Sequence, residues 1–161
     1  MVSIKILGAD ALINHLKLLA SFIESFRPAL EKVANQINEE EKNVFSAQGA
    51  FEGRAKWKPL SPRYARMKAQ MYPGKPILKA TEEMFTQVSG RSGVYVLTDR
   101  SVELGTELIY AATQQYGRGK IPARPFLTAT DKQIKKWGSI IDDYVFDVSK
   151  KAGFEVFRIE R

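Results

Sequence analysis

Few side chains in this sequence have the types and spacing that catalysis or metal binding requires. The chain has one histidine, His15, and because a metal site needs clustered ligands, we expect His15 to lie on or near the surface of a helix. The pairs Glu82–Glu83 and Asp142–Asp143 are neighbours in sequence, and neighbouring helix positions point about 100° apart. Neither pair therefore forms an acid–base couple, and Glu39–Glu41 are expected on a solvated helix face.

The sequence also lacks the motifs of common nucleophilic and nucleotide-binding sites. It contains no cysteine, which excludes disulfides, thiolate metal sites and thiol nucleophiles. There is no G-x-S-x-G, no P-loop and no G-x-G-x-x-G, and the glycines of Y-G-R-G-K at 116–120 do not follow a strand. We therefore expect no enzyme and no cofactor. A small hydrolase is a third interpretation, which a cleft with convergent polar groups of perturbed pKa would favour.

The strongest chemical signal is a block of positive charge in the middle of the chain. The net charge is +7, and residues 53–81 hold eight cations and no Asp or Glu. These candidates for contact with DNA or with a neighbouring protein are Arg54, Lys56, Lys58, Arg63, Arg66, Lys68, Lys75 and Lys79. Such a block favours an anionic partner, either phosphate or an acidic protein surface. The alternative interpretation is a basic loop that only faces solvent.

The N-terminal part of the chain predicts a short strand and a long helix. Residues 2–7 alternate between apolar and polar, and helical spacing extends from Asp10 to about Gln48. Helical steps of four, three, four and three are made by Leu12, Leu16, Leu19, Ile23 and Phe26. Pro28 interrupts this stripe, so we expect one long kinked helix or two abutting helices. Such a helix would span about 60 Å, and part of it should project and pack on a neighbouring chain.

The rest of the chain predicts a basic loop, short strands and a second long helix. Residues 49–79 are rich in Gly, Pro and cations, and we expect a mobile loop with one short helix from Ser61. The later elements are strands at Phe85–Val88, Val94–Leu97 and Val102–Leu104, helices at Ile109–Tyr116 and Thr130–Lys150, and a strand at 154–159. The apolar face of the last helix is expected to hold Ile134, Trp137, Ile141, Tyr144 and Val148.

The order of these elements indicates the fold class. We expect a single α+β domain over residues 1–161, in which the long kinked N-terminal helix and the C-terminal helix pack on a small, mostly antiparallel sheet. No apolar run approaches the roughly 20 residues that cross a bilayer, so we expect a soluble protein without a membrane partner.

Three short motifs resemble the virion-morphogenesis, or tail-completion, family of tailed phages. They are W-K-P-L-S at 57–61, Y-A-A-T-Q-Q-Y-G at 110–117 and I-P-A-R-P-F-L at 121–127. The resemblance covers about residues 45–145, and Ile77-Leu78 also has the expected place. Two departures are Gln114, where many members have histidine, and K-A-T-E-E-M-F at 79–85, where many have Thr-Gly-x-Leu.

The residues of these motifs are expected to brace loops against the sheet. Pro122 and Pro125 keep the chain extended between them. Arg124, held on this stiff segment, suits a bidentate contact to a carboxylate, either in a neighbouring subunit or within its own chain. The motif residues singled out as structural are Trp57, Pro59, Leu60, Tyr110, Gln115, Gly117, Pro122, Pro125 and Phe126.

The resemblance implies a structural protein that completes the tail and contributes to the head–tail junction, as a ring of identical copies. The implied partners are tail-tube and head–tail connector proteins, and DNA backbone in the lumen if the basic loop faces it. The implied location is the virion tail or neck, with assembly in the cytoplasm of the bacterial host. The alternative is a sequence-independent nucleic-acid-binding module that uses the basic residues 54–79.

Overall fold

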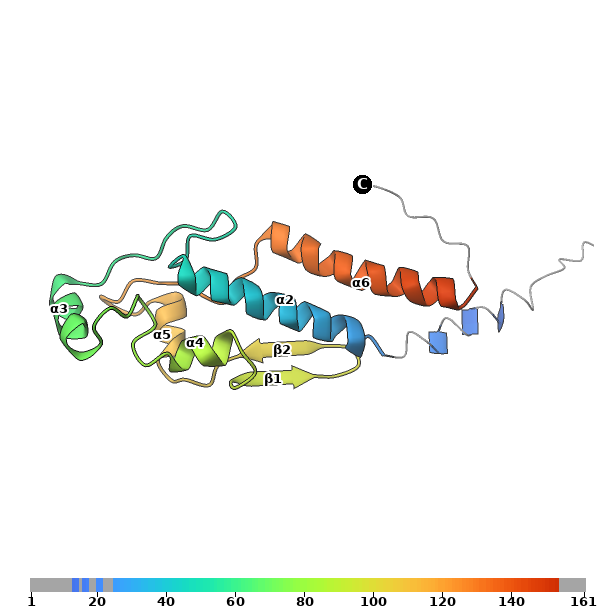
Figure 1. Ribbon diagram of the computed structural model, residues 1–161, viewed down its shortest axis with the longest axis horizontal. Helices are drawn as coiled ribbons and strands as arrows, with labels where there is room; N and C mark the ends of the chain where they lie inside the picture. The colour runs from blue at the N-terminus through green and yellow to red at the C-terminus, as the bar shows by residue number, and fades with distance from the viewer. Residues whose placement is uncertain (1–12, 15, 18–19, 22–24, 154–161) are drawn as a thin grey trace, which may run out of the picture.

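The computed structural model describes residues 13–14, 16–17, 20–21 and 25–153. The molecule is elongated: α2 and α6 run side by side along its length, a β-hairpin lies against α2, and α3 lies at one end (Figure 1). The elements are α2 (Arg27–Ser46), α3 (Pro62–Met71), α4 (Glu83–Val88), β1 (Val94–Leu97), β2 (Val102–Gly105), α5 (Ala111–Tyr116) and α6 (Asp131–Lys151). The strands predicted at 2–7 and 154–159 lie outside the described residues.

The predicted N-terminal helix is interrupted completely before Pro28. Residues 25 and 26 are not helical, whereas the described residues between 13 and 21 are. Pro28 lies in the first turn of α2, where its missing N–H has no helical partner to lose. The amide of Phe26 donates to the carbonyl of Asp99 at 2.7 Å. Of the two alternatives, a kinked helix or two abutting helices, the chain therefore adopts the second.

The predicted meander is a two-stranded hairpin preceded by a helix. β1 and β2 pair antiparallel, with Val94 opposite Gly105 and Leu97 opposite Val102, as the sequence predicts. The strand predicted at Phe85–Val88 is wrong, because these residues lie in α4. Met84 and Val88 are four residues apart, so a helix buries both on one face. The α+β class with long helices at both ends is confirmed.

The hydrophobic core is built around Phe45 near the end of α2. Its ring centroid lies 5.4 Å from that of Trp57 and 6.0 Å from that of Phe126, within the range of favourable aromatic pairs. Val44, Met84, Val88 and Ala111 complete this cluster and are all buried. The core therefore joins α2 and α4 to all three motif segments singled out in the sequence.

A buried polar network joins α2 to α6. One carboxylate oxygen of Glu40, Oε2, accepts from Gln133 Nε2 at 2.9 Å and from the Trp137 indole at 3.0 Å. Gln133 also completes the capping box of Thr130 at the start of α6. Glu40 and Glu41 are each only 3% exposed, so the expectation of a solvated face holds only for Glu39. On α6 the side chain that faces α2 here is Gln133, which is 1% exposed. Ile134 was expected on the buried face, but it is 54% exposed.

Glu41 lies beside this network without a hydrogen-bond partner. Its Oε2 atom is buried and unpaired among the described residues, as are Nε and Nη1 of Arg54. Burial raises the pKa of the Glu41 carboxyl from 4.5 to about 8, although the nearby Arg54 guanidinium acts in the opposite direction. Glu41 is therefore largely protonated in the folded chain at neutral pH.

This carboxyl gives the stability of the protein a specific pH dependence. Between about pH 4.5 and about pH 8 the folded state holds a proton that the unfolded state releases, so the free energy of unfolding falls as pH rises. Glu41→Gln should flatten that slope by up to about 1.4 kcal/mol per pH unit, measured by urea denaturation. The exposed Glu39→Gln is the control and should keep the slope. An unchanged slope in Glu41→Gln would contradict the assignment.

Candidate functional site

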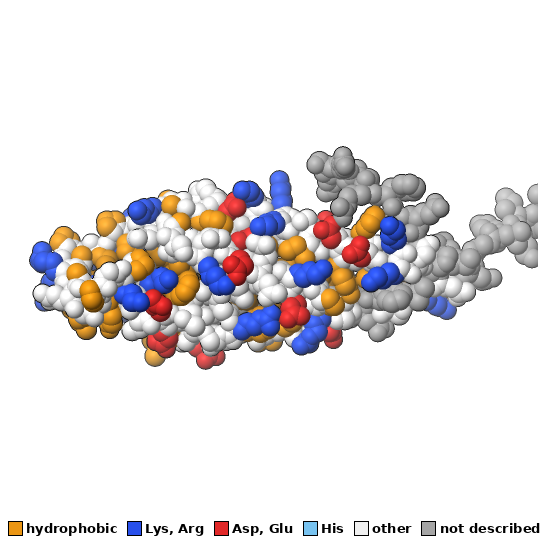
Figure 2. All heavy atoms as spheres, viewed as in Figure 1, with side chains coloured by type: hydrophobic (Ala, Val, Ile, Leu, Met, Phe, Trp, Pro, Cys, Tyr) orange, Lys and Arg blue, Asp and Glu red, His pale blue; other side chains and the backbone are white. Residues whose placement is uncertain are grey.

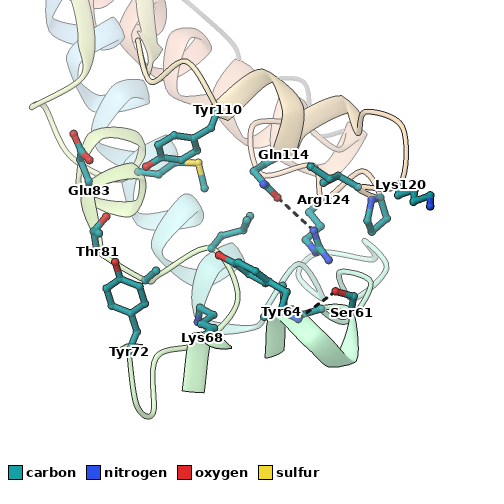
Figure 3. Close-up of a pocket in the computed structure, with 16 residues that line it drawn as sticks. Ser61, Tyr64, Lys68, Tyr72, Thr81, Glu83, Tyr110, Gln114, Lys120 and Arg124 are labelled. Atoms are coloured by element: carbon teal, nitrogen blue, oxygen red, sulfur yellow. Dashed lines mark hydrogen bonds between the residues drawn. The ribbon is translucent and has the colours of Figure 1, made fainter. Parts of the chain in front are cut away.

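A cavity of about 610 Å³ opens at the α3 end of the molecule (Figure 3). We name it the tip groove. It lies between α3 and α5 with the loops that flank them, and such a volume is typical of binding pockets. Its apolar and aromatic lining consists of Leu60, Tyr64, Tyr72, Leu78, Ala80, Met84, Tyr110, Ile121 and Pro122. Its polar lining consists of Ser61, Lys68, Thr81, Glu83, Gln114, Lys120 and Arg124.

Helix α3 forms one wall of the tip groove and begins as the sequence predicts. Ser61 caps it by accepting from the amide of Tyr64, and Pro62 lies in its first turn. Lys68, on the same helix, is only 6% exposed. Its ammonium donates to the carbonyls of Lys75 and Pro76, the latter at 2.7 Å, and burial lowers its pKa. Lys68 was expected to face DNA or a partner, but it ties α3 to the turn that follows.

Arg124 is the second cation that the structure removes from the predicted contact surface. It is 3% exposed, and its Nε and Nη2 donate to the carbonyls of Lys58 at 2.8 Å and Pro59 at 2.9 Å. A third nitrogen, Nη1, donates to the side-chain oxygen of Gln114 at 3.4 Å (Figure 3). The predicted carboxylate contact is therefore wrong within the described chain: Arg124 braces two loops through backbone carbonyls, and burial lowers its pKa.

The other motif residues complete this brace. The Trp57 indole donates to the carbonyl of Pro125 at 2.7 Å. Gln115 binds the same segment from α5: its Oε1 accepts from the amides of Phe126 and Leu127, and its Nε2 donates to the carbonyl of Leu127 at 2.8 Å. Phe126 is 1% exposed. The motifs at 57–61, 110–117 and 121–127 thus meet in one hydrogen-bonded unit.

Gly117 makes the turn between α5 and this segment possible. It ends α5 with φ of 77°, a region that side chains rarely adopt. A Cβ atom there would lie 2.9 Å from the carbonyl oxygen of Ile121 and 2.8 Å from the amide nitrogen of Ala123. Only glycine therefore allows residues 121–123 to pass so close to the end of α5.

The remaining predicted cations are divided between paired and free positions. Lys75 pairs with Glu82, Lys79 lies 3.7 Å above the Phe85 ring, and Arg54 donates to Gln133. Four are exposed and have no ion pair with any described residue: Lys56, Lys58, Arg63 and Arg66. The structure therefore reduces the predicted basic surface from eight side chains of the block to these four.

The tip groove holds three groups whose pKa is shifted: Tyr110, Lys68 and Arg124. Burial raises the pKa of Tyr110, and the nearby Glu83 carboxylate acts in the same direction. Burial lowers the pKa of Lys68 and of Arg124, and both side chains donate to backbone carbonyls. Within the described residues no three His, Cys, Asp or Glu side chains are placed to hold a metal ion. Sequence reasoning missed the groove itself, because Tyr72, Met84 and Ile121 come together only in the folded chain.

The motifs at 57–61, 110–117 and 121–127 all lie within the part of the chain that matches a known protein family. Residues 9–145 match the model of the phage virion morphogenesis family. The chain belongs to this family. It matches no curated protein and no solved structure. Family membership confirms the resemblance found in the sequence and makes the chain a virion-associated assembly protein of a phage. No helix in the described part of the chain is long and apolar enough to cross a membrane.

The brace at Arg124 yields a test of its structural role. Arg124→Ala would leave the carbonyls of Lys58 and Pro59 without their donor, and we expect a loss of about 2–3 kcal/mol in the free energy of unfolding, measured in urea. Arg63→Ala removes an exposed arginine of the same tip and should change stability by less than about 0.5 kcal/mol. Equal stability of the two variants would contradict the brace.

Proposed function

We propose that this protein completes the phage tail and forms part of the head–tail junction, as a closed ring of identical copies. Membership of the virion morphogenesis family over residues 9–145 carries the proposal. The role is structural rather than enzymatic, and the lining of the tip groove supports this because two of its three cations, Lys68 and Arg124, are held by backbone carbonyls. The neighbours in the virion would be tail-tube and head–tail connector proteins.

Two exposed apolar surfaces of the chain support a ring. Large apolar side chains are exposed around the tip groove, including Tyr64 and Ile121. Others, Ile13 and Leu16, are exposed in the helical segment before α2, beyond the opposite end of the molecule. Contacts between different surfaces of identical copies build rings when the rotation closes.

The four free cations suit the lumen of such a ring. Lys56, Lys58, Arg63 and Arg66 lie on or next to α3 and are exposed. Side chains of this kind bind phosphate without reading base sequence. We therefore propose that they face the DNA that passes through the junction.

Loss of the protein should separate heads from tails. In electron micrographs of lysates that lack it, we expect DNA-filled heads and free tails of normal length, because nothing completes the tail end that binds the head. Restoring the gene in trans is the control. Tails of uncontrolled length would indicate a terminator instead, and normally joined particles would contradict the proposal.

Neutralising the free cations should impair infectivity without unfolding the chain. We expect the quadruple variant Lys56→Gln, Lys58→Gln, Arg63→Gln and Arg66→Gln to keep the thermal transition of the wild type but to lower the titre in complementation. A matched control changes four exposed lysines of α2 and α6 that have no ion pair with any described residue: Lys32, Lys135, Lys150 and Lys151. An unchanged titre would contradict the lumen assignment, and tight, salt-dependent DNA binding by the isolated monomer would favour a nucleic-acid-binding module.

A further inference from the structure

The tip groove is the centre of an exposed apolar surface. Tyr64 and Met67 on α3 are 44% and 46% exposed, and Met71, one turn further, is 60% exposed. Across the groove, Tyr110 and Ile121 are 44% and 43% exposed. Figure 2 shows hydrophobic side chains gathered at this end of the molecule. Large apolar patches of this kind mark protein contacts, and Met and Tyr adapt well to a partner.

The segment of residues 10–24 carries an apolar surface of its own. Its helical stripe contains Leu12, Leu16, Leu19 and Ile23. In its described part, residues 13–14, 16–17 and 20–21 are helical and all exposed, and Ile13 and Leu16 are 45% and 50% exposed. A short helix with so many apolar side chains is unstable in water without a partner.

The chain's own tip groove is out of reach of this segment. α2 begins at the end of the molecule opposite α3 (Figure 1). That start is fixed: Ser25 Oγ donates to Asp99 Oδ1 at 2.8 Å, and the Tyr144 hydroxyl donates to the carbonyl of Ser25 at 2.8 Å. Fifteen residues span about 22 Å in any helix, whereas α2 alone spans about 30 Å. A neighbouring copy must therefore supply the groove.

Charge favours the N-terminal segment over the C-terminal one as occupant. The four free cations of the tip, Lys56, Lys58, Arg63 and Arg66, are exposed and lie on or next to α3. Residues 10–24 hold Asp10 and Glu24 against Lys17, a net charge of −1 with His15 neutral. Residues 154–161 hold two Glu and two Arg, a net charge of zero. The basic tip therefore attracts the first segment more strongly.

We infer that residues 10–24 of one copy dock, as an amphipathic helix, into the tip groove of the next copy. Leucines at positions four and three residues apart fit the helix-in-groove mode of recognition. Each copy then contributes its N-terminal segment to one neighbour and its tip groove to the other, so the contact is head-to-tail. This inference rests on the proposed ring and names the surfaces that close it.

Cross-linking between two singly substituted chains tests this docking. The natural chain has no cysteine, so a mixture of a Leu16→Cys chain and a Met67→Cys chain has only the two introduced thiols. We expect a short bismaleimide to join the two chains. Leu16→Cys mixed with Val96→Cys, an exposed residue of β1, is the control and should react at least about tenfold less. Equal reaction of both pairs, or no reaction of the first, would overturn the inference.

A second variant keeps the test independent of cross-linking geometry. Leu16→Asp places a charge on the half-exposed stripe and should weaken self-association, measured by sedimentation, at least about tenfold. Lys17→Asp, on another face, should have a smaller effect. If Leu16→Asp self-associates like the wild type, the docking is wrong. Two outcomes distinguish the docking from the proposed junction role. A full titre for Leu16→Asp contradicts the docking alone. Cross-linking of the first pair, together with normally joined particles in lysates that lack the protein, contradicts the junction role alone.

Discussion

The end of the molecule that carries the tip groove depends on one guanidinium. Arg124 binds the carbonyls of Lys58 and Pro59, 66 and 65 residues away in sequence. These carbonyls lie just before α3, so the arginine fixes the segment from which α3 starts. From the same segment before α3, the Trp57 indole donates to the carbonyl of Pro125, the neighbour of Arg124. Several hydrogen bonds between the same two segments make such a junction rigid, and this rigidity gives the groove two fixed walls.

The paired helices α2 and α6 connect this end to the other. Their contact includes a polar network, in which Glu40 accepts from Gln133 and Trp137. Such a buried network costs desolvation, but it fixes how the two helices align. The opposite end is defined by Asp99, which holds Ser25 and Phe26. The tip groove and the start of α2 therefore lie at opposite ends of the molecule (Figure 1).

The sequence predicted the elements with clear local signals and missed those decided by tertiary contacts. Ser61 with Pro62, Gly117 and Thr130 each mark a helix end through chemistry within a few residues, and all three are confirmed. Phe85–Val88 was mistaken for a strand because four residues show no clear period. The placement of Lys68 and Arg124 could not be predicted, because their carbonyl partners are brought to them only by the fold. The motifs therefore identified the family but not the contact surface.

We propose that one copy of this protein binds the next at the tip groove. A reconstruction of the virion neck by electron cryo-microscopy tests it most directly, since it shows every copy in its place. We expect a closed ring in which the surface formed by Tyr64, Met67 and Ile121 is covered by a neighbouring copy. A ring in which these side chains face solvent, or a junction that holds this chain as a single copy, would contradict it.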